Sequence, residues 1–92
     1  MITNVKITKR AEKELVKVPR HIAVNLRTWA RAVKLEGLEN IRKIKGYHDE
    51  PLKGDRLGQR SIRLSKAYRA IYSIEDGKVQ VVVVEEVNKH EY

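Results

Sequence analysis

The dipeptide Asp76-Gly77 constrains the fold of this chain more than any other feature. It lies between two stretches rich in β-branched residues and tyrosine, 68–74 and 79–87. Asp-Gly at such a position favours a two-residue turn between antiparallel strands. The second stretch holds four consecutive valines at 81–84, a run typical of a strand buried on both faces. The sequence therefore predicts a β-hairpin whose second strand is central in a sheet.

Two arginines fall on predicted strands just before that turn. Apolar and polar side chains alternate over 61–65, so we expect a strand with Arg63 on its polar face. Arg69 follows in the predicted strand 68–74. Folding alone does not require positive charge at these positions, although charge on an edge strand also discourages aggregation. Both arginines are therefore candidates for a binding surface.

The first third of the chain predicts one short strand and two helices. Residues 2–7 alternate as in a strand, and Thr8 has the side chain of a helix N-cap. Proline disfavours helical geometry in the residue before it, so Pro19 ends one helix and suits the start of the next. Gly37 is a typical helix stop. The predicted fold is α+β, in the order β-α-α-β-β-β, with an antiparallel sheet covered on one face by a two-helix hairpin.

Length and composition narrow the classes of function. We expect residues 1–92 to form a single domain. The absence of cysteine excludes disulfides and thiolate metal sites, and three histidines at 21, 48 and 90 do not form a ligand pattern, so we expect no metal and no cofactor. No apolar run approaches the roughly 20 residues that cross a bilayer. We expect a cytoplasmic protein without a membrane partner.

The charge of the chain favours a polyanionic partner. Twenty Lys and Arg against twelve Asp and Glu give a net charge of +8. Residues 42–69 hold nine of these cations and three of the acids, hence a net +6. Such a concentration points first to nucleic acid. A second basic group on the second helix (Arg27, Arg31 and Lys34) is either a solvated face or a surface for an acidic segment or an RNA backbone.

A surface rich in arginine with a few proton-transfer groups suits RNA cleavage without metal. The ribose 2′-OH attacks the adjacent phosphorus, which requires a base, an acid for the leaving 5′-oxygen and cations for the charge on the phosphorane. The planar guanidinium matches phosphate oxygens and stays charged at any working pH. Preorganised cations stabilise charge that grows in the transition state, and a positioned acid or base adds typically about 10²–10⁴-fold.

Four motifs carry a resemblance to a known family. In chain order they are Glu50-Pro51-Leu52-Lys53-Gly54, then Gly58-x-x-Ser61-x-Arg63, then Tyr68-Arg69-x-Ile71-Tyr72, and a terminal His90-x-Tyr92. Together they resemble the RelE/HigB superfamily of type II toxins, with similarity to its YoeB-like and HigB-like branches. That resemblance implies a microbial-RNase-like sheet covered by two helices, as in small ribosome-dependent mRNA endonucleases.

The resemblance also implies roles for individual residues. The implied catalytic set is Glu50 as a candidate base, Lys53, Arg63 and Arg69 at the scissile phosphate, and His90 or Tyr92 as the general acid. Further contacts to RNA are implied for Lys45, Arg56, Arg60 and Lys66. Residues 49–54 are expected to form a loop. The alternative for Glu50 and Lys53 is therefore that they are an ordinary ion pair of that loop, without a role in catalysis.

The C-terminal tail departs from the YoeB-like pattern, in which the histidine and tyrosine are adjacent. Here Glu91 separates His90 from Tyr92. An extended tail keeps both side chains on one face, because side chains alternate with period two. A turned tail brings only one of them to the site, and a frayed tail has no role in the reaction.

Three functions follow from these observations. The first is a toxin that cleaves mRNA in the ribosomal A site, leaves a 2′,3′-cyclic phosphate, docks on ribosomal RNA and is neutralised by a cognate antitoxin. The second is a ParE-like inhibitor of DNA gyrase on the same fold, which has no chemical need for the catalytic set. The third is a non-catalytic RNA-binding module. One Trp, four Tyr and no Phe argue against base stacking as its main mode.

Overall fold

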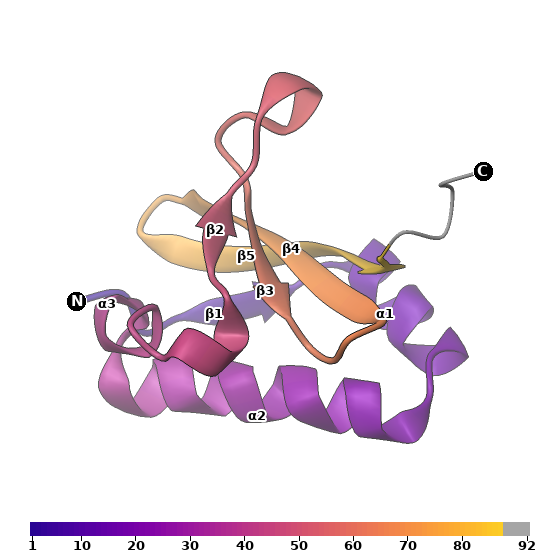
Figure 1. Cartoon of the computed structure of the whole chain (residues 1–92). Coiled ribbons are helices and arrows are strands. Elements are labelled where there is room, and N and C mark those ends of the chain that lie inside the picture. The colour runs from indigo at the N-terminus through magenta and orange to yellow at the C-terminus, as the bar shows by residue number, and fades with distance from the viewer. Residues whose placement is uncertain (88–92) are drawn as a thin grey trace.

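The computed structural model describes residues 1–87 of the 92, and their elements follow the predicted order with one short helix, α3, and one short strand, β2, in addition (Figure 1). The first half contains β1 (Val5–Ile7), α1 (Lys9–Lys17), α2 (Arg20–Glu36) and α3 (Leu38–Ile41). The second half contains the 3₁₀ turn η1 (Lys45–Tyr47), β2 (Glu50–Pro51), the 3₁₀ turn η2 (Gly54–Arg56), β3 (Arg60–Arg63), β4 (Tyr68–Glu75) and β5 (Lys78–Glu86). The described helices are all too short or too polar to cross a membrane.

The strands form one sheet in the order β1-β5-β4-β3-β2. Neighbouring strands from β2 to β5 pair antiparallel, whereas β1 pairs with β5 in parallel. The parallel pair is a departure from the expected all-antiparallel sheet. It arises because the chain leaves β1 through a helical crossover, and such a connection is long enough to bring a strand back in the same direction. The α+β class, with helices over one face of the sheet, is confirmed (Figure 1).

The hairpin that the sequence predicts most strongly is present. Asp76 and Gly77 connect β4 to β5 with φ angles of 53° and 73°. Two central residues with positive φ are what a turn of type I′ requires, and aspartate and glycine tolerate that conformation. The turn sets the register of the long hairpin, since Glu75 lies opposite Lys78 and Tyr72 opposite Val81.

A β-bulge then shifts this register by one residue. Tyr72 pairs with Val81, but the next residue along β4, Ile71, pairs with Val83, which leaves Val82 as the extra residue. Because side chains alternate along a strand, an extra residue changes which side chains face each side. Val81 and Val84 therefore both reach the helical layer, and Glu85 lies on the opposite face.

The two faces of the sheet are consequently unlike. The face toward the helices contributes Ile62, Leu64, Ala70, Tyr72, Val79, Val81 and Val84 to the core. The other face, called the open face below, carries two rows of paired residues. One row is Glu50, Ser61, Ile71 and Val83, and the next is Arg63, Arg69 and Glu85. The predicted strand with its arginine on the polar face is thereby confirmed.

The two predicted helices pack buried apolar residues against the sheet. The N-cap Thr8 accepts a hydrogen bond from the backbone N–H of Ala11 at 3.2 Å, and α2 begins directly after Pro19. Gly37 ends α2 with a φ of 86°. Trp29 is fully buried, and its ring centroid lies 5.3 Å from that of Tyr72 on β4. This aromatic pair joins α2 to the centre of the sheet.

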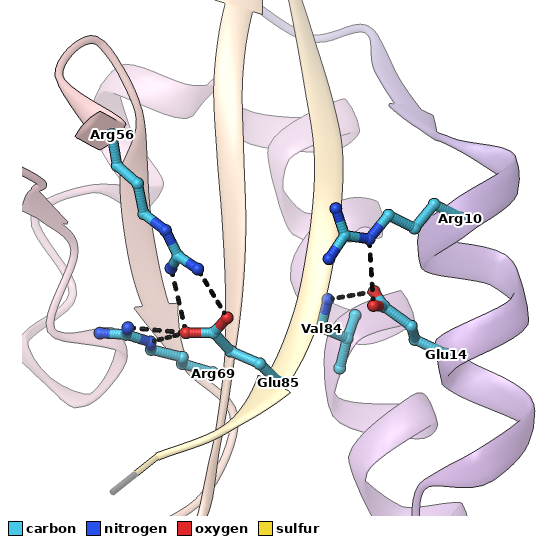
Figure 2. A network of polar contacts seen from close by, with 6 residues as sticks. All are labelled: Arg10, Glu14, Arg56, Arg69, Val84 and Glu85. Carbon is cyan, nitrogen blue, oxygen red and sulfur yellow. Dashed lines mark hydrogen bonds and ion pairs between the residues drawn. The ribbon is translucent and has the colours of Figure 1, made fainter. Parts of the chain in front are cut away.

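One carboxylate attaches α1 to β5 beyond the end of β1. The parallel pairing with β1 reaches Val81, after which no strand accompanies β5 on that side in the described chain. There the backbone N–H of Val84 donates to Oε1 of Glu14 at 2.8 Å (Figure 2). Arg10 donates to the other oxygen of Glu14 at 3.3 Å. The side chain thus satisfies a backbone group of β5 and fixes the helix beside it.

This contact can be tested through stability. Glu14→Ala is expected to lower the free energy of unfolding by about 1–3 kcal/mol, because it leaves a part-buried N–H without an acceptor. Glu14→Gln keeps an oxygen in place and is expected to lose less. Urea denaturation of both variants measures the difference. The exposed Glu36→Ala serves as the control and should stay within about 0.5 kcal/mol of the parent. Equal losses for the alanine and glutamine variants would contradict the assigned role.

Candidate active site

A shallow groove lies along the open face where β2, β3 and β4 run side by side. Its volume is about 270 Å³, and its lining includes His48, Glu50, Arg63, Lys66, Arg69 and Val87. Three of the predicted catalytic residues and one predicted RNA contact therefore share one groove. The expected loop at 49–54 is in part the short strand β2, whose Glu50 pairs with Ser61. This pairing is the reason that the Glu50 side chain reaches the open face.

Two arginines lie directly opposite each other in the groove. Arg63 on β3 and Arg69 on β4 are register partners, and like charges at such positions repel. Each has another contact in the folded chain. Nη1 of Arg63 lies 3.4 Å from Nε2 of His48, and Arg69 forms an ion pair with Glu85 on β5. The repulsion favours binding of an anion between the two guanidinium groups.

Glu85 accepts from two arginines at once (Figure 2). Arg56 donates to both of its oxygens at 3.0 Å. Arg69 donates to Oε2 from Nε at 2.8 Å and from Nη2 at 2.6 Å. Burial by itself would raise the pKa of Glu85, but the hydrogen bonds and charges of the two arginines outweigh burial and lower it below 4.5. The carboxylate is therefore ionised at neutral pH and partly neutralises both arginines.

The buried side chain of Asp49 holds the segment just before β2 to the sheet. It is 1% exposed and accepts from Nε of Arg60 at 2.6 Å and from the hydroxyl of Tyr72 at 2.6 Å. Burial, together with the bond to Asp49, raises the pKa of Tyr72 to about 12. Tyr72 therefore stays a neutral donor. Asp49, called the Asp49 anchor below, lies between His48 and Glu50 in the sequence. By fixing the backbone at residue 49, it also positions these two side chains at the groove.

His48 is a groove residue that sequence reasoning missed. It caps η1 in a left-handed conformation, with φ 46° and ψ 49°. A non-glycine residue in that region is uncommon and is enriched at functional sites. A guanidinium can only donate, so a hydrogen bond from Arg63 would use the lone pair of a neutral imidazole. No sequence motif marks His48, because its place beside Arg63 results from η1 and from the Asp49 anchor.

The other predicted residues lie outside the groove lining. Arg56 is joined to the site only through Glu85, and Arg60 points to the helical face, where Asp49 holds it. Lys53 precedes η2 and Lys45 begins η1, and both are exposed. His90 and Tyr92 lie outside the described residues. Among residues 1–87, no three His, Asp or Glu side chains cluster as metal ligands would.

A comparison of the sequence with known families identifies the chain. A model of the ParE toxin of the type II toxin–antitoxin system parDE matches residues 5–91. The chain belongs to this toxin family. It is therefore the toxin component of a type II toxin–antitoxin system, which confirms the resemblance drawn from the motifs. No curated protein matches the toxin sequence.

Solved structures similar to the toxin confirm its fold. The RelBE2 toxin–antitoxin complex of Mycobacterium tuberculosis aligns with 25% identity and a TM-score of 0.69, over 94% of the toxin and 99% of that chain. The archaeal RelE–RelB complex of Pyrococcus horikoshii aligns with 22% identity and a TM-score of 0.71, over 97% and 99%. YafQ of Escherichia coli aligns with 15% identity and a TM-score of 0.72, over 91% and 92%.

The Asp49 anchor predicts a large loss of stability on substitution. Asp49→Ala removes the carboxylate that pairs with the part-buried guanidinium of Arg60 and accepts from the buried Tyr72 hydroxyl, so we expect a loss of about 3–5 kcal/mol in the free energy of unfolding. Urea denaturation measures it. Asp55→Ala removes an equal charge at an exposed position and is the control. A loss under about 1 kcal/mol for Asp49→Ala would contradict the anchoring role.

The lowered pKa of Glu85 predicts a pH dependence. A carboxyl whose folded pKa is depressed contributes stability that is complete above its unfolded pKa, here near 4.5, and lost as the pH falls through the lower folded value. The difference in unfolding free energy between the parent and Glu85→Gln should therefore be constant from about pH 7 to 5 and shrink below about pH 4.5. A difference that stays constant down to about pH 3 would show that the arginines do not stabilise the carboxylate.

Proposed function

We propose that the toxin is an endoribonuclease that cleaves mRNA on the ribosome by attack of the ribose 2′-OH on the adjacent phosphorus. The observation that carries the proposal is the groove on the open face. It joins an imidazole, a carboxylate and three cations from different elements, namely His48, Glu50, Arg63, Lys66 and Arg69. These are the group types that the reaction needs, and all of them are accessible to a phosphate from solvent.

The cations of the groove bind the scissile phosphate. Arg63 is exposed and Arg69 lies directly across the strand pair, so their guanidinium groups contact oxygens of one phosphate. Lys66, in the turn between β3 and β4, adds a third positive charge at the same groove. Such cations stabilise the phosphorane more than the substrate, since its oxygens carry more charge. Lys53 extends the basic surface toward the flanking RNA.

The proton transfers fall to the acidic and imidazole groups. Glu50 is in the groove as a carboxylate that takes the proton of the 2′-OH, and His48 is the second candidate base. Imidazole also gives a proton near neutral pH, which the leaving 5′-oxygen requires. The family resemblance implies the acid role for a histidine or a tyrosine of the C-terminal end. His90 or Tyr92 is therefore the further candidate acid.

Basic residues outside the groove bind ribosomal RNA. Lys45 is exposed on η1, three residues before the groove residue His48 in the sequence. Contacts between such cations and phosphates release counterions, so binding of the toxin to ribosomes weakens steeply with salt. This surface brings the groove to mRNA in the A site and accounts for the excess of positive charge.

A cognate antitoxin is the protein partner. Two of the similar structures are complexes of a toxin with its antitoxin. In the present toxin, a hollow of about 860 Å³ is lined by Val5 of the edge strand β1 and by residues of α2 that include Arg27, Arg31 and Lys34. An extended acidic segment suits it, because the outer edge of β1 has unpaired backbone groups and the helix supplies positive charge.

Inhibition of DNA gyrase is the alternative, and two observations favour it. The matched family is that of ParE. In addition, Glu85 occupies Arg56 and Arg69, which a nuclease would use for phosphate. An inhibitor that binds gyrase has no need for His48 or for a free arginine pair. The two functions differ in what expression of the toxin does to cellular mRNA.

Mapping of mRNA 5′ ends in a bacterium that expresses the toxin separates these functions. The parent is expected to produce cuts in phase with codons, and His48→Gln and Arg63→Gln to reduce them at least about tenfold, because each removes a group from the groove. Arg20→Gln, exposed at the start of α2, is the matched control and should cut like the parent.

Two other results would contradict the proposal. A response to DNA damage without new mRNA ends would favour the gyrase inhibitor. Binding of RNA by the purified toxin without cleavage, with or without ribosomes, would point to an RNA-binding module.

A further inference from the structure

The pair Arg56 and Arg69 has the geometry of a phosphate-binding site that is filled by a side chain of the toxin itself. Four contacts from the two guanidinium groups converge on the two oxygens of Glu85, at 2.6 to 3.0 Å (Figure 2). Forked guanidinium groups bind phosphate oxygens in the same bidentate manner. The carboxylate therefore stands where one phosphate of a nucleic acid would bind.

Three features show that this ion pair is more than a structural link. The side chains of Glu85, Arg56 and Arg69 are 24%, 40% and 31% exposed, so a ligand can reach all three. Arg69 also lines the groove and lies opposite Arg63, which places the pair beside the proposed scissile phosphate. A phosphate that replaces the carboxylate offers oxygens to the same donors, so neither guanidinium is left unpaired. The carboxylate can thus be exchanged for another anion at modest cost.

We propose that Arg56 and the Nε and Nη2 groups of Arg69 form a second phosphate subsite, which takes the RNA phosphate next to the scissile one, and that Glu85 is its internal competitor, while Nη1 of Arg69 contacts the scissile phosphate. The inference rests on the proposed nuclease function and adds a subsite and its control to it. When RNA enters the groove, a backbone phosphate replaces the carboxylate on both arginines. Until then, Glu85 lowers the affinity of the toxin for RNA that lies outside the ribosome, because ligand and carboxylate compete for the same donors.

The β-bulge is what makes this competition possible. If the pairing next to the Asp76-Gly77 turn continued along the hairpin without a bulge, Arg69 would lie opposite Val84. The extra residue Val82 shifts the pairing so that Glu85 lies opposite Arg69. A carboxylate placed by a bulge beside a row of cations is a specific feature of this hairpin, since bulges are common where a side chain is redirected near a site.

The test measures binding of an RNA that cannot be cut. A fluorescein-labelled octamer of 2′-O-methyl RNA has no free 2′-OH, so its affinity for the purified toxin is independent of cleavage. Fluorescence anisotropy is measured for the parent, for Glu85→Gln and for Glu75→Gln. Glu75 provides the matched control, because it is an exposed glutamate at the far end of β4 and its substitution changes the net charge equally.

The competitor role predicts a gain in affinity on loss of the carboxylate. Glu85→Gln is expected to bind about three- to tenfold more tightly than the parent, against less than about twofold for Glu75→Gln. The slope of log affinity against log salt should steepen by about 0.7, the value for one added phosphate contact on a single strand. Adding Arg56→Gln to Glu85→Gln should abolish the gain. An octamer of DNA tests whether the subsite distinguishes the two backbones.

Other outcomes overturn the inference without touching the nuclease proposal. Weaker or unchanged binding by Glu85→Gln, with a thermal unfolding midpoint close to that of the parent, would make Glu85 a residue that positions the arginines. An equal gain in RNA affinity for Glu85→Gln and Glu75→Gln would mean that the affinity depends only on net charge. A gain for DNA but not for RNA would assign the subsite to another nucleic acid. Conversely, RNA binding as predicted by a toxin that cuts no mRNA would support the subsite and contradict the nuclease proposal.

Discussion

The buried carboxylate of Asp49 is the contact on which the candidate site depends. It accepts hydrogen bonds from Arg60 on β3 and from Tyr72 on β4, and so fixes the segment before β2 to the centre of the sheet. Tyr72 in turn packs against Trp29 of α2. The helical core, the sheet and the groove are therefore joined through three side chains. Loss of the carboxylate would free His48 and Glu50 from the positions in which they face Arg63.

The sequence predicts most of the fold because the local signals agree with one another. Asp76-Gly77, Thr8, Pro19 and Gly37 each have a conformational preference that the chain adopts. The parallel pairing of β1 was not predictable in the same way. Alternation identifies a strand, but the direction of its partner depends on how the intervening helices return the chain. β2 was also missed, since two residues are too short to show any period.

The site was predicted only in part, and the reason is the register. Alternation over 61–65 is sufficient to place Arg63 on the polar face of its strand, whereas the position of Arg69 opposite Arg63 follows from the pairing of β3 with β4. Glu85 could not be found, because counting back from the turn pairs Arg69 with Val84 and no sequence signal announces the bulge at Val82. The sequence holds no signal for His48, because its position is set by tertiary contacts of its neighbour Asp49. Charged residues such as Arg56 and Arg60 were counted as free cations, although each has a carboxylate partner.

These carboxylate partners bear on the proposed nuclease activity. Of the cations around the groove, Arg56 and Arg69 are shared with Glu85, while Arg63 and Lys66 have no carboxylate partner in the described chain. In the proposed nuclease, Arg63 and Lys66 would bind phosphate directly, whereas Arg56 and Arg69 would first have to release Glu85. Proton transfer by Glu50, His48 and the C-terminal residues would complete the reaction.

The chemistry of the ends that the toxin leaves tests this account most directly. Purified toxin is added to ribosomes carrying a defined mRNA with an occupied P site and an empty A site, and the 3′ end of the upstream fragment is analysed. Attack by the 2′-OH predicts a 2′,3′-cyclic phosphate upstream and a 5′-OH downstream, and none with an mRNA that carries 2′-deoxyribose at the cut position. A 3′-OH with a 5′-phosphate, or intact mRNA together with inhibited DNA supercoiling by gyrase, would contradict it.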